Sequence, residues 1–450
     1  MESHIFREYD IRGVFPDELN QQTVHLLGLA LGTYYQENRA GRISLGHDCR
    51  LSSPDISRWL VKGLLESGMD VVDIGMVPSP ILYFSLHNLD VDGGIEITGS
   101  HNPPEFNGIK VCLGEASIYG QEIQKIREII ESGDFRHGHG KEESASIIGQ
   151  YADYLIGNIQ PGPVKRKVVL DAGNGAGGIV ACDIYRRMGF EVIPLFCEPD
   201  GRFPNHHPDP TIPEYLQAMI SKVHDTSSDL GIAFDGDADR IGVTNQEGDI
   251  IWGDQLMIIF ARDLLTRHPG AKIIGEVKCS QALYDDIERH GGQAIMWKAG
   301  HSLIKNKMKV EGALLAGEMS GHLFFAERYF GYDDAIYAGA RLLEILSHTE
   351  EDLKDLLADI PKMVNTPEIR IDCPDDKKFK VVAGLVDEFK KDYEVIDVDG
   401  ARVLFDGGWG LIRASNTQPV LVLRFEARDK NRLEEIRKIF DDKLKELDLL

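Results

Sequence analysis

One arrangement of strands and helices occurs three times before about residue 360 of this 450-residue sequence. Each copy has a β-rich strand ending in a polar loop, a helical stretch, a second strand that begins near a glycine, and a third strand that runs into a glycine turn. The first strands are RISLGHD (42–48), KVVLDAG (167–173) and KIIGEVK (272–278); the second lie at 68–75, 189–196 and 292–298; the third are GIEITG (94–99), GIAFDG (231–236) and GALLAG (312–317). Strands that alternate with helices predict α/β domains with mixed, largely parallel sheets.

The residues after the third strand differ in chemistry from copy to copy. Two glycines stand five positions apart in each third strand, which aligns the copies at the second glycine. The loops that follow are Ser100-His101-Asn102, Asp237-Ala238-Asp239-Arg240 and Glu318-Met319-Ser320-Gly321-His322. Since ligands bind at the carboxyl ends of strands in open α/β sheets, we expect the loops to meet in one cleft. They would supply a nucleophile, a metal site and a site for hydroxyl groups.

The pattern changes after about residue 360, where Pro361 and Pro367 mark a break. Strands are predicted at 368–373, 394–398, 403–405 and 420–425, and helices at 377–391 and 430–447. This order is typical of a smaller α+β unit. The predicted architecture is thus three similar α/β domains and a C-terminal α+β domain around a central cleft, with bounds 1–145, 146–250, 251–362 and 363–450.

Composition excludes several classes of protein. The net charge of −24 argues against nucleic acid or an anionic membrane as the main partner. The six cysteines are scattered without a CxxC pair, which argues against a zinc site or a disulfide framework and fits a reducing compartment. No apolar run is long enough to cross a bilayer, and no signal segment is apparent, so a cytoplasmic location is expected, with no obligatory protein partner.

The loop Asp235-Gly236-Asp237-Ala238-Asp239-Arg240 carries the strongest local signal. Alternating aspartates on a tight loop can direct three carboxylates to one point, which suits a hard cation such as Mg²⁺. An EF-hand is excluded, because Arg240 stands where that loop needs glycine and Gln246 where it needs glutamate. The alternative is a solvated acidic turn, but three acids directly after a buried-type strand favour the metal.

Other polar clusters are less specific. Taken alone, Thr98 to Pro103 also fits an ordinary surface turn, and Arg413 to Thr417 fits a hairpin loop as well as a phosphate site. Tyr9 and Arg12 could be surface residues at the entry to a strand or helix. A histidine at a strand end, such as His301, is more often hydrogen-bonded than catalytic.

Taken together, these clusters resemble the α-D-phosphohexomutases, and within them the phosphomannomutase/phosphoglucomutase group. TGSHNPPEFNGIK (98–110) is similar to that family's phosphoserine loop, DGDADR (235–240) to its Mg²⁺ loop, GEMSGH (317–322) to its sugar-recognition loop and RASNT (413–417) to its phosphate-binding loop. The four occur in family order over essentially the whole chain. The resemblance implies a four-domain enzyme that interconverts hexose 6-phosphate and hexose 1-phosphate, of mannose or glucose, through phospho-Ser100 and a hexose 1,6-bisphosphate, which also serves as activator.

The resemblance also implies roles for individual residues. Mg²⁺ would be held by Ser100, Asp235, Asp237 and Asp239. Charge at the transferring phosphate would be stabilised by Arg12, Lys110, Arg240 and Lys278, and protons would be moved by His101 and His301. The phosphorylated hexose would contact the following residues: Tyr9, Lys278, Gly300, His301, Glu318, Ser320, His322, Arg413, Ser415, Asn416 and Thr417.

Two positions depart from the family pattern. Ala238 replaces a glycine found in many members, and Ala299 replaces a threonine before the Gly-His pair. The methionine of GEMSGH favours mannose and glucose phosphates over glucosamine phosphate, although a phosphoglucosamine mutase stays an alternative. A metal-dependent sugar phosphatase would need no phosphate anchor so far along the chain from its serine. A sugar-phosphate binding protein without activity would need neither nucleophile nor metal.

Overall fold

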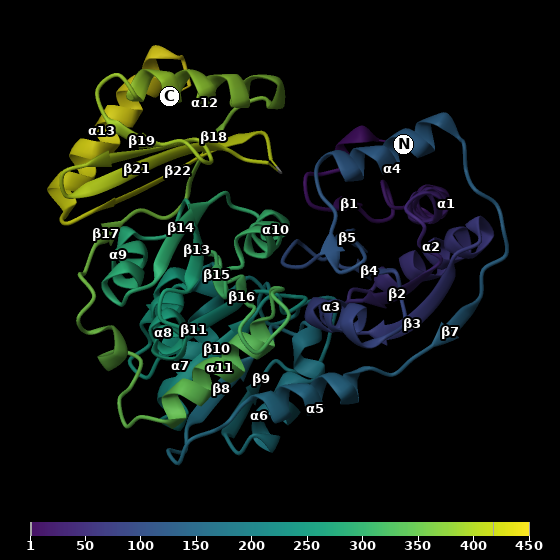
Figure 1. Ribbon diagram of the computed structural model, residues 1–450, viewed down its shortest axis with the longest axis horizontal. Coiled ribbons are helices and arrows are strands. Elements are labelled where there is room, and N and C mark those ends of the chain that lie inside the picture. Colours follow the sequence, from purple (N-terminus) through teal and green to yellow (C-terminus); the bar gives the residue numbers. More distant parts are fainter. Residues whose placement is uncertain (1, 417, 450) are drawn as a thin grey trace.

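The computed structural model describes residues 2–416 and 418–449, which form four sheets (Figure 1). The first sheet has the strand order β1-β5-β4-β2-β3-β7, with β6 beside β5, and its core strands β3, β2 and β4 are parallel. Its elements are β1 (Ile11–Val14), α1 (Gln21–Glu37), β2 (Arg42–His47), α2 (Ser53–Ser67), β3 (Asp70–Met76), α3 (Ser79–Asn88), β4 (Gly93–Ile97), β5 (Phe106–Leu113), β6 (Ala116–Ser117), α4 (Gln121–Ser132) and β7 (Glu142–Ser144).

The second and third sheets repeat the parallel core of the first. The second has the order β12-β11-β10-β8-β9, and the third the order β14-β13-β15-β16. Their elements are α5 (Ile148–Asn158), β8 (Lys167–Asp171), α6 (Ala181–Arg187), β9 (Glu191–Leu195), α7 (Gln217–Thr226), β10 (Leu230–Phe234), β11 (Ile241–Asn245), β12 (Ile250–Ile251), α8 (Gly253–Arg267), β13 (Lys272–Glu276), α9 (Gln281–Arg289), β14 (Gln293–Trp297), α10 (His301–Glu311), β15 (Leu315–Gly317), β16 (Leu323–Phe325) and α11 (Ala335–Ser347). The repeat inferred from the sequence is thus confirmed strand by strand.

The C-terminal part forms an antiparallel sheet of order β17-β22-β21-β20-β19, with β18 also beside β22. Its elements are β17 (Val364–Asn365), β18 (Ile369–Asp372), α12 (Asp375–Phe389), β19 (Glu394–Ile396), β20 (Ala401–Phe405), β21 (Gly408–Ala414), β22 (Val420–Ala427) and α13 (Lys430–Glu446). Helix α13 buries Ile436, Phe440 and Leu444 against this sheet, as its apolar stripe predicts. The expected α+β character of this domain is confirmed.

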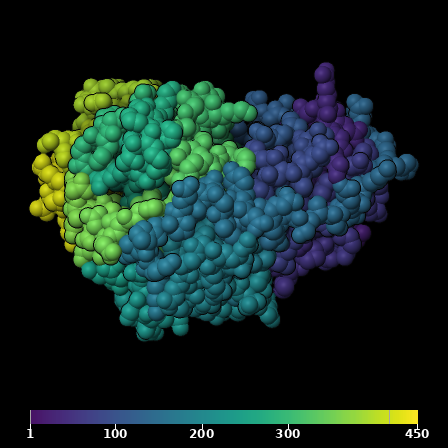
Figure 2. Space-filling model, turned by 60° about the horizontal axis from the view of Figure 1, so that its bottom comes forward, coloured from purple at the N-terminus to yellow at the C-terminus, as the bar shows by residue number. Residues whose placement is uncertain are grey.

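The first domain has a buried cluster of its own, between Ile5 and Ile126, but a second cluster joins the first three domains. This second cluster of buried side chains includes Leu82 of α3, Tyr151 of α5, Ile232 of β10 and Ile336 of α11. Helix α11 follows the third sheet in the chain but packs on β10 and β11 of the second sheet. Figure 2 shows the first domain and the teal second segment in direct contact on one face of the molecule. The exact domain borders stay predictions.

Strand β10 (LGIAF) is buried at every residue, which is typical of a strand covered on both faces. It delivers the Asp235 loop from the centre of the second sheet. Strand β4 is equally buried and delivers the Ser100 loop from the first sheet. Among the described helices, none combines the length and hydropathy needed to cross a membrane.

Candidate active site

Ser100 lies one turn beyond β4 and is almost fully buried. Its hydroxyl donates to Oδ2 of Asp235 at 2.8 Å, and its Oγ lies 3.1 Å from Nδ1 of His101. Its backbone has the left-handed φ of 48°, a conformation that side chains rarely adopt and that is found at functional turns. The backbone N–H of Ser100 donates to the Thr98 hydroxyl at 2.8 Å, which helps to hold this turn. The predicted nucleophile and the predicted metal loop are therefore in contact.

Arg50 holds the Ser100 loop through hydrogen bonds to its backbone. Its fully buried guanidinium donates to the carbonyl oxygens of Ser100 and Asn102, at 2.8 and 2.5 Å, and to those of two further loop residues, Pro103 and Phe106. Asp48 accepts the backbone N–H of Gly99 at 3.1 Å. A Cβ at Gly99 would lie 2.4 Å from the Arg50 guanidinium, so only glycine fits there. Sequence reasoning placed a polar loop after the first strand but gave Asp48 and Arg50 no role.

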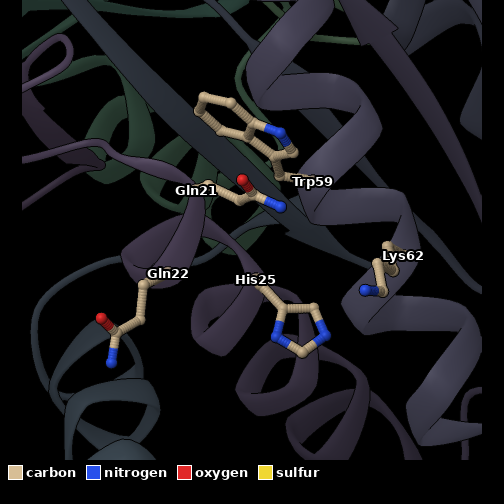
Figure 3. Close-up of a pocket in the computed structure, with 5 residues that line it drawn as sticks. All are labelled: Gln21, Gln22, His25, Trp59 and Lys62. Atoms are coloured by element: carbon tan, nitrogen blue, oxygen red, sulfur yellow. The ribbon is translucent and has the colours of Figure 1, made fainter.

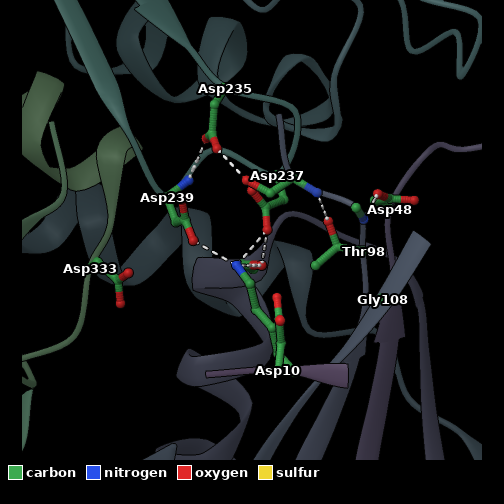
Figure 4. Close-up of polar contacts among 12 residues, drawn as sticks. Asp10, Asp48, Thr98, Gly108, Asp235, Asp237, Asp239 and Asp333 are labelled. Carbon is green, nitrogen blue, oxygen red and sulfur yellow. Dashed lines mark hydrogen bonds and ion pairs between the residues drawn. The ribbon is translucent and has the colours of Figure 1, made fainter. Parts of the chain in front are cut away.

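Asp235, Asp237 and Asp239 bring one carboxylate oxygen each within 4.8 Å of one another, and all three are buried (Figure 4). Backbone N–H groups of Asp239 and Arg240 donate to Oδ1 of Asp235, at 3.0 and 3.1 Å, and shape the loop. Within the described part of the chain, Oδ1 of Asp237 and Oδ1 of Asp239 are buried without a hydrogen-bond partner. Oxygen ligands that are converged, buried and unsatisfied fit a hard divalent cation such as Mg²⁺.

Ala238 adopts the left-handed φ of 56° within this loop. The resemblance implied glycine at this position, which adopts such a φ without strain, and the chain has alanine there. Its methyl group is fully buried, and a Cβ at Gly177 would lie 2.8 Å from it. The Ala238 methyl group therefore leaves no room for a side chain at Gly177.

Lys110 lies between two of the aspartates. Its ammonium donates to Oδ2 of Asp237 and to Oδ2 of Asp239, both at 2.6 Å, and to the Ser79 hydroxyl at 3.2 Å.

These contacts shift the pKa values of the cluster. Burial alone would lower the pKa of Lys110, but the two carboxylates raise it well above its usual value. Burial tends to raise the pKa of Asp237, but the charge and hydrogen bond of Lys110 lower it, and the net effect is a lowered pKa. The pKa of Asp235 is raised, first by burial and then by its two aspartate neighbours. A bound cation would reverse that shift.

Arg240, His322 and Asp333 form a chain beside the carboxylates. Arg240 Nε donates to Nε2 of His322 at 2.9 Å, so Nε2 is an acceptor and, in the neutral ring, Nδ1 carries the proton. That Nδ1 lies 3.0 Å from Oδ2 of Asp333. The same carboxylate oxygen lies 3.7 Å from Nδ1 of His301. Asp333 was missed in the sequence, because it follows β16 in a loop without any motif.

The two candidate proton carriers are neutral imidazoles. Burial, followed by the positive charges of Arg240 and Arg12, holds the pKa of His101 well below its usual value. Burial and Lys305 do the same to the pKa of His301, against the opposite effect of Asp333. At pH 7 both rings are therefore able to accept a proton.

A second group of predicted residues joins three domains. The Tyr9 hydroxyl donates to the Ala299 carbonyl oxygen at 3.1 Å and accepts from Nδ2 of Asn416 at 2.7 Å. Glu318 accepts the backbone N–H of Gly300 at 2.6 Å. Because only the backbone of residue 299 takes part in this contact, the threonine-to-alanine departure leaves it intact.

The remaining candidates lie around this group. Arg413 is buried, and its Nε donates to Asp399 at 2.8 Å, while Asp399 also accepts the N–H of Ala299 at 3.1 Å. Lys278 is held between Glu276 and Glu368, at 3.8 and 3.5 Å. Ser320 is half-buried and Ser415 is buried. Thr417 lies outside the described residues.

The carboxylate cluster with the Arg240–His322–Asp333 chain is the first group, and the contacts among Tyr9, Ala299, Asn416, Gly300 and Glu318 are the second. The two groups meet at His301. Its ring lies 5.6 Å from the His322 ring and 5.9 Å from the Tyr9 ring. Arg12 lies at the edge of the first group, where it donates to Asp10 and faces the Asn102 amide. A pocket of about 300 Å³ lies between α1 and α2 (Figure 3), and it is lined by Gln21, Gln22, His25, Trp59 and Lys62. None of these is a predicted site residue.

Comparison with known protein families gives four matches in chain order. Three are the α/β/α domains I, II and III of phosphoglucomutase/phosphomannomutase, at residues 3–137, 150–248 and 252–364. The fourth is the C-terminal domain of the same proteins, at residues 368–443. Together the matches cover most of the chain.

Individual relatives are similar over their full length. A phosphomannomutase/phosphoglucomutase of Pseudomonas putida is 47% identical over 441 residues, covering 98% of this chain and 95% of the relative. A phosphoglucomutase of Neisseria gonorrhoeae is 45% identical, covering 97% of this chain and 95% of the relative. A crystal structure of a phosphoglucomutase/phosphomannomutase family protein from Burkholderia thailandensis superposes with a TM-score of 0.93 at 42% identity, covering 99% and 98% of the two chains.

Proposed function

The chain belongs to the phosphoglucomutase/phosphomannomutase family and is a phosphohexomutase, and on this premise we propose how its residues transfer the phosphoryl group. Ser100 carries a phosphoryl group and gives it to the free hydroxyl of a mannose or glucose monophosphate. The bisphosphate formed then returns its other phosphate to Ser100. The single observation that carries this proposal is the 2.8 Å contact between the Ser100 hydroxyl and Asp235 of the carboxylate cluster.

Asp235, Asp237 and Asp239 would hold Mg²⁺ next to Ser100, as their converged oxygens and the unsatisfied buried Oδ1 atoms of Asp237 and Asp239 suggest. When bound, the ion would draw negative charge from the transferring phosphoryl group. Lys110 and Arg240 supply fixed positive charge at the same place. Arg50 and Asp48 hold the serine loop in position, and such positioning provides most of the catalysis in phosphoryl transfer.

Proton transfer to and from the sugar hydroxyl requires a neutral base. His101 and His301 meet this requirement, because burial lowers the pKa of both. His301 lies between the carboxylate cluster and the Tyr9 group, so we assign it to the hydroxyl of the bound sugar. His322, whose Nε2 accepts from Arg240, orients that arginine.

The second group would hold the other end of the substrate. Arg413, Ser415, Asn416 and Thr417 are assigned to the phosphate that is not transferred, and Glu318 and Ser320 to the sugar hydroxyls. Tyr9 and Gly300 position these groups by their contacts with Asn416 and Glu318. The bisphosphate must turn end for end between the two half-reactions, so each of its phosphates visits both groups.

Peptide mass spectrometry tests the proposal directly. The protein is incubated with Mg²⁺ and glucose 1,6-bisphosphate, and the peptide that contains Ser100 is expected to gain one phosphoryl group. Mannose or glucose monophosphate should discharge it with little release of free phosphate, and the two discharge rates rank the sugars. Ser100→Ala should remain folded, lose the label and lose activity, while Ser132→Ala, at an exposed serine of the same domain, should keep both.

Three outcomes would contradict the proposal. An unlabelled Ser100 in folded protein would indicate a binding protein without activity. Loss of the label to water at the same rate without sugar would indicate a phosphatase. Faster discharge by glucosamine monophosphate than by either hexose would indicate the phosphoglucosamine mutase alternative.

A further inference from the structure

Two cysteines from different secondary-structure elements, Cys182 and Cys197, meet in the second domain. Cys182 lies in the first turn of α6, and Cys197 follows the end of β9. Their Sγ atoms are 3.3 Å apart, and both thiols are free. A disulfide bond brings its two sulfurs to about 2.0 Å, so a side-chain movement of just over 1 Å would join them.

The two thiols are not equivalent. The Cys197 sulfur also lies 3.4 Å from the carbonyl oxygens of Leu170 and Leu195, to which its S–H can donate. Pairing with the Cys197 thiol lowers the pKa of Cys182, burial opposes this, and the positive charge of Arg186 lowers it further. The same pairing and burial raise the pKa of Cys197. Cys182 is thus the more readily formed thiolate, and Cys197 the partner that keeps its proton.

A small oxidant would reach the pair from the Cys197 side, because Cys197 is half-buried whereas Cys182 is buried beside it, with 9% of its surface exposed. The other four cysteines are buried and belong to different parts of the molecule: Cys49, Cys112, Cys279 and Cys373. Sequence spacing gave no sign of the pair, because Cys182 and Cys197 come from two elements that only the fold brings together.

Cys197 begins the segment 197–207, which reaches the Ser100 loop. The Asn174 side chain donates to the Glu198 carbonyl oxygen at 2.8 Å and accepts from Nδ2 of Asn205 at 2.7 Å, so it ties both ends of the segment. Gly201 packs on the backbone at Cys49 and Arg50, where a Cβ would lie 2.5 Å from the Cys49 carbonyl oxygen.

The far end of the segment touches the catalytic loop itself. The Phe203 ring lies under the Arg50 guanidinium, with 5.2 Å between the guanidinium carbon and the ring centre. His207 Nε2 contacts the His101 carbonyl oxygen. A shift at Cys197 is therefore connected, through one short and well-packed segment, to His101 next to Ser100 and to Arg50, which holds the Ser100 loop.

We propose that Cys182 and Cys197 form a reversible redox site, at which a hydroperoxide joins the two sulfurs and thereby slows phosphoryl transfer at Ser100. The slowing rests on the proposed function of Ser100, whereas the bond between the cysteines does not.

The chemistry needs only the two thiols and the peroxide. The Cys182 thiolate attacks one peroxide oxygen, the O–O bond breaks, and a sulfenic acid and hydroxide result. The Cys197 sulfur then attacks the Cys182 sulfur, the S–S bond forms, and the S–O bond breaks. The hydroxide that leaves takes the Cys197 proton as water. Two thiols are oxidised by one peroxide, which is reduced to two waters, and a dithiol reductant restores both thiols by exchange.

The test treats the reduced protein with one equivalent of hydrogen peroxide and maps the cysteines by differential alkylation and peptide mass spectrometry. A peptide linking Cys182 to Cys197 is expected, with kcat lowered by about 2- to 30-fold and restored by dithiothreitol. Cys182→Ser and Cys197→Ser should each abolish both the linked peptide and the reversible loss. Cys373→Ser, in the fourth domain, should retain both.

Phosphorylation of Ser100 by the bisphosphate is measured in the same samples. Failure of the reduced protein to become phosphorylated would refute the proposed function and not the redox site. If Ser100 is phosphorylated, the redox proposal is refuted by peroxide oxidation of other cysteines without the Cys182–Cys197 link. It is equally refuted by a complete link that leaves kcat unchanged. Should a serine variant fold poorly, the linked peptide and its reversal in the unmodified protein still decide the question.

Discussion

At the scale of single residues, the backbone around Ser100 depends on the guanidinium of Arg50, whose donors reach carbonyl oxygens in four residues of that loop. Lysine carries a compact ammonium with three donors and cannot reproduce this planar fork. The buried Ser100 carbonyl oxygen would be left without this donor, which costs about 1–3 kcal/mol.

We therefore expect Arg50→Lys to lower kcat by about 10- to 100-fold, with a smaller effect on KM, because the serine is displaced and the substrate site is not. Steady-state kinetics and thermal unfolding measure the two effects. Arg58→Lys is the control, because Arg58 is exposed and forms an ion pair with Asp55 on the helix surface. A kcat of Arg50→Lys within twofold of the parent would show that the loop holds its shape without the guanidinium.

The sequence revealed those active-site residues that stand in a recurring position. The Ser100 and Asp235 loops each follow the third strand of a copy, and the rule about carboxyl ends of strands correctly predicted that they would meet. Arg50 and Asp333 act through partners that are distant in the chain, so no local pattern identifies them. Likewise, Cys182 and Cys197 form no motif in the sequence, and only the fold brings their sulfurs to 3.3 Å.

At the scale of secondary-structure elements, α1 and α2 pack with their backbones in contact. A Cβ at Gly63 of α2 would lie 2.3 Å from the His25 carbonyl oxygen of α1, and one at Gly28 would lie 2.3 Å from the Leu60 carbonyl oxygen. Since backbone atoms cannot move aside as a flexible side chain does, glycine is required at both positions.

Gly63→Ala is therefore expected to lower the free energy of unfolding by about 1–3 kcal/mol or more, although alanine is the better helix former. Gly157→Ala is the matched control, because Gly157 in α5 has open space around it, and this change should be neutral or stabilising by about 0.5–1 kcal/mol. Denaturant unfolding measures both. Equal effects of the two substitutions would contradict the close packing of α1 on α2.

Helix α11 begins at Asp334, a fully buried aspartate whose side chain accepts the N–H of Tyr337 and the hydroxyls of Tyr151 and Tyr329. Burial raises the pKa of Asp334 to about 6, against the opposite effect of these hydrogen bonds. The folded protein therefore keeps a proton between about pH 4 and 6 that the unfolded chain releases. This contribution to stability is complete at low pH and is lost as the pH rises through 6.

Asparagine at position 334 can still cap the helix but cannot ionise. Relative to the parent, Asp334→Asn should gain stability on going from pH 4 to pH 7, by on the order of 3 kcal/mol. Denaturant unfolding at the two pH values measures this difference. The same pH dependence in both proteins would show that Asp334 ionises as in the unfolded chain.

At the scale of the whole molecule, the Tyr9 hydroxyl of the first domain bonds both Ala299 of the third and Asn416 of the fourth. Tyr9→Phe removes both hydrogen bonds with little change in shape. Each is worth about 0.5–1.5 kcal/mol, so KM should rise by about 5-fold, and by up to about 150-fold if both bonds count fully, with a smaller change in kcat.

Tyr34→Phe is the control, because the Tyr34 hydroxyl bonds Glu122 within the first domain alone. Kinetics with a hexose monophosphate at saturating activator separate KM from kcat. A fall in kcat without any rise in KM would place Tyr9 in the chemical step.

The number and order of the domains could be predicted from the sequence, because strand alternation and glycine turns are local signals. The way in which the domains share buried side chains could not be predicted from the sequence. The apolar stripe of α11 shows that the helix is buried, yet nothing within it tells which sheet covers it. Its residues fall in the predicted range 251–362, but Gly339 packs on Tyr185 and Ile232 of the second domain.

The packing of α11 on the second sheet affects how the protein folds during synthesis. The last strand of the second sheet ends at Ile251, and α11 begins roughly 80 residues later. At about 5–20 residues per second, the ribosome needs several seconds to supply the missing helix. During that interval the apolar face of β10 and β11 has no cover on the newly made chain. The second domain can therefore complete its core only when the third has been synthesised, and the two are expected to fold as one unit.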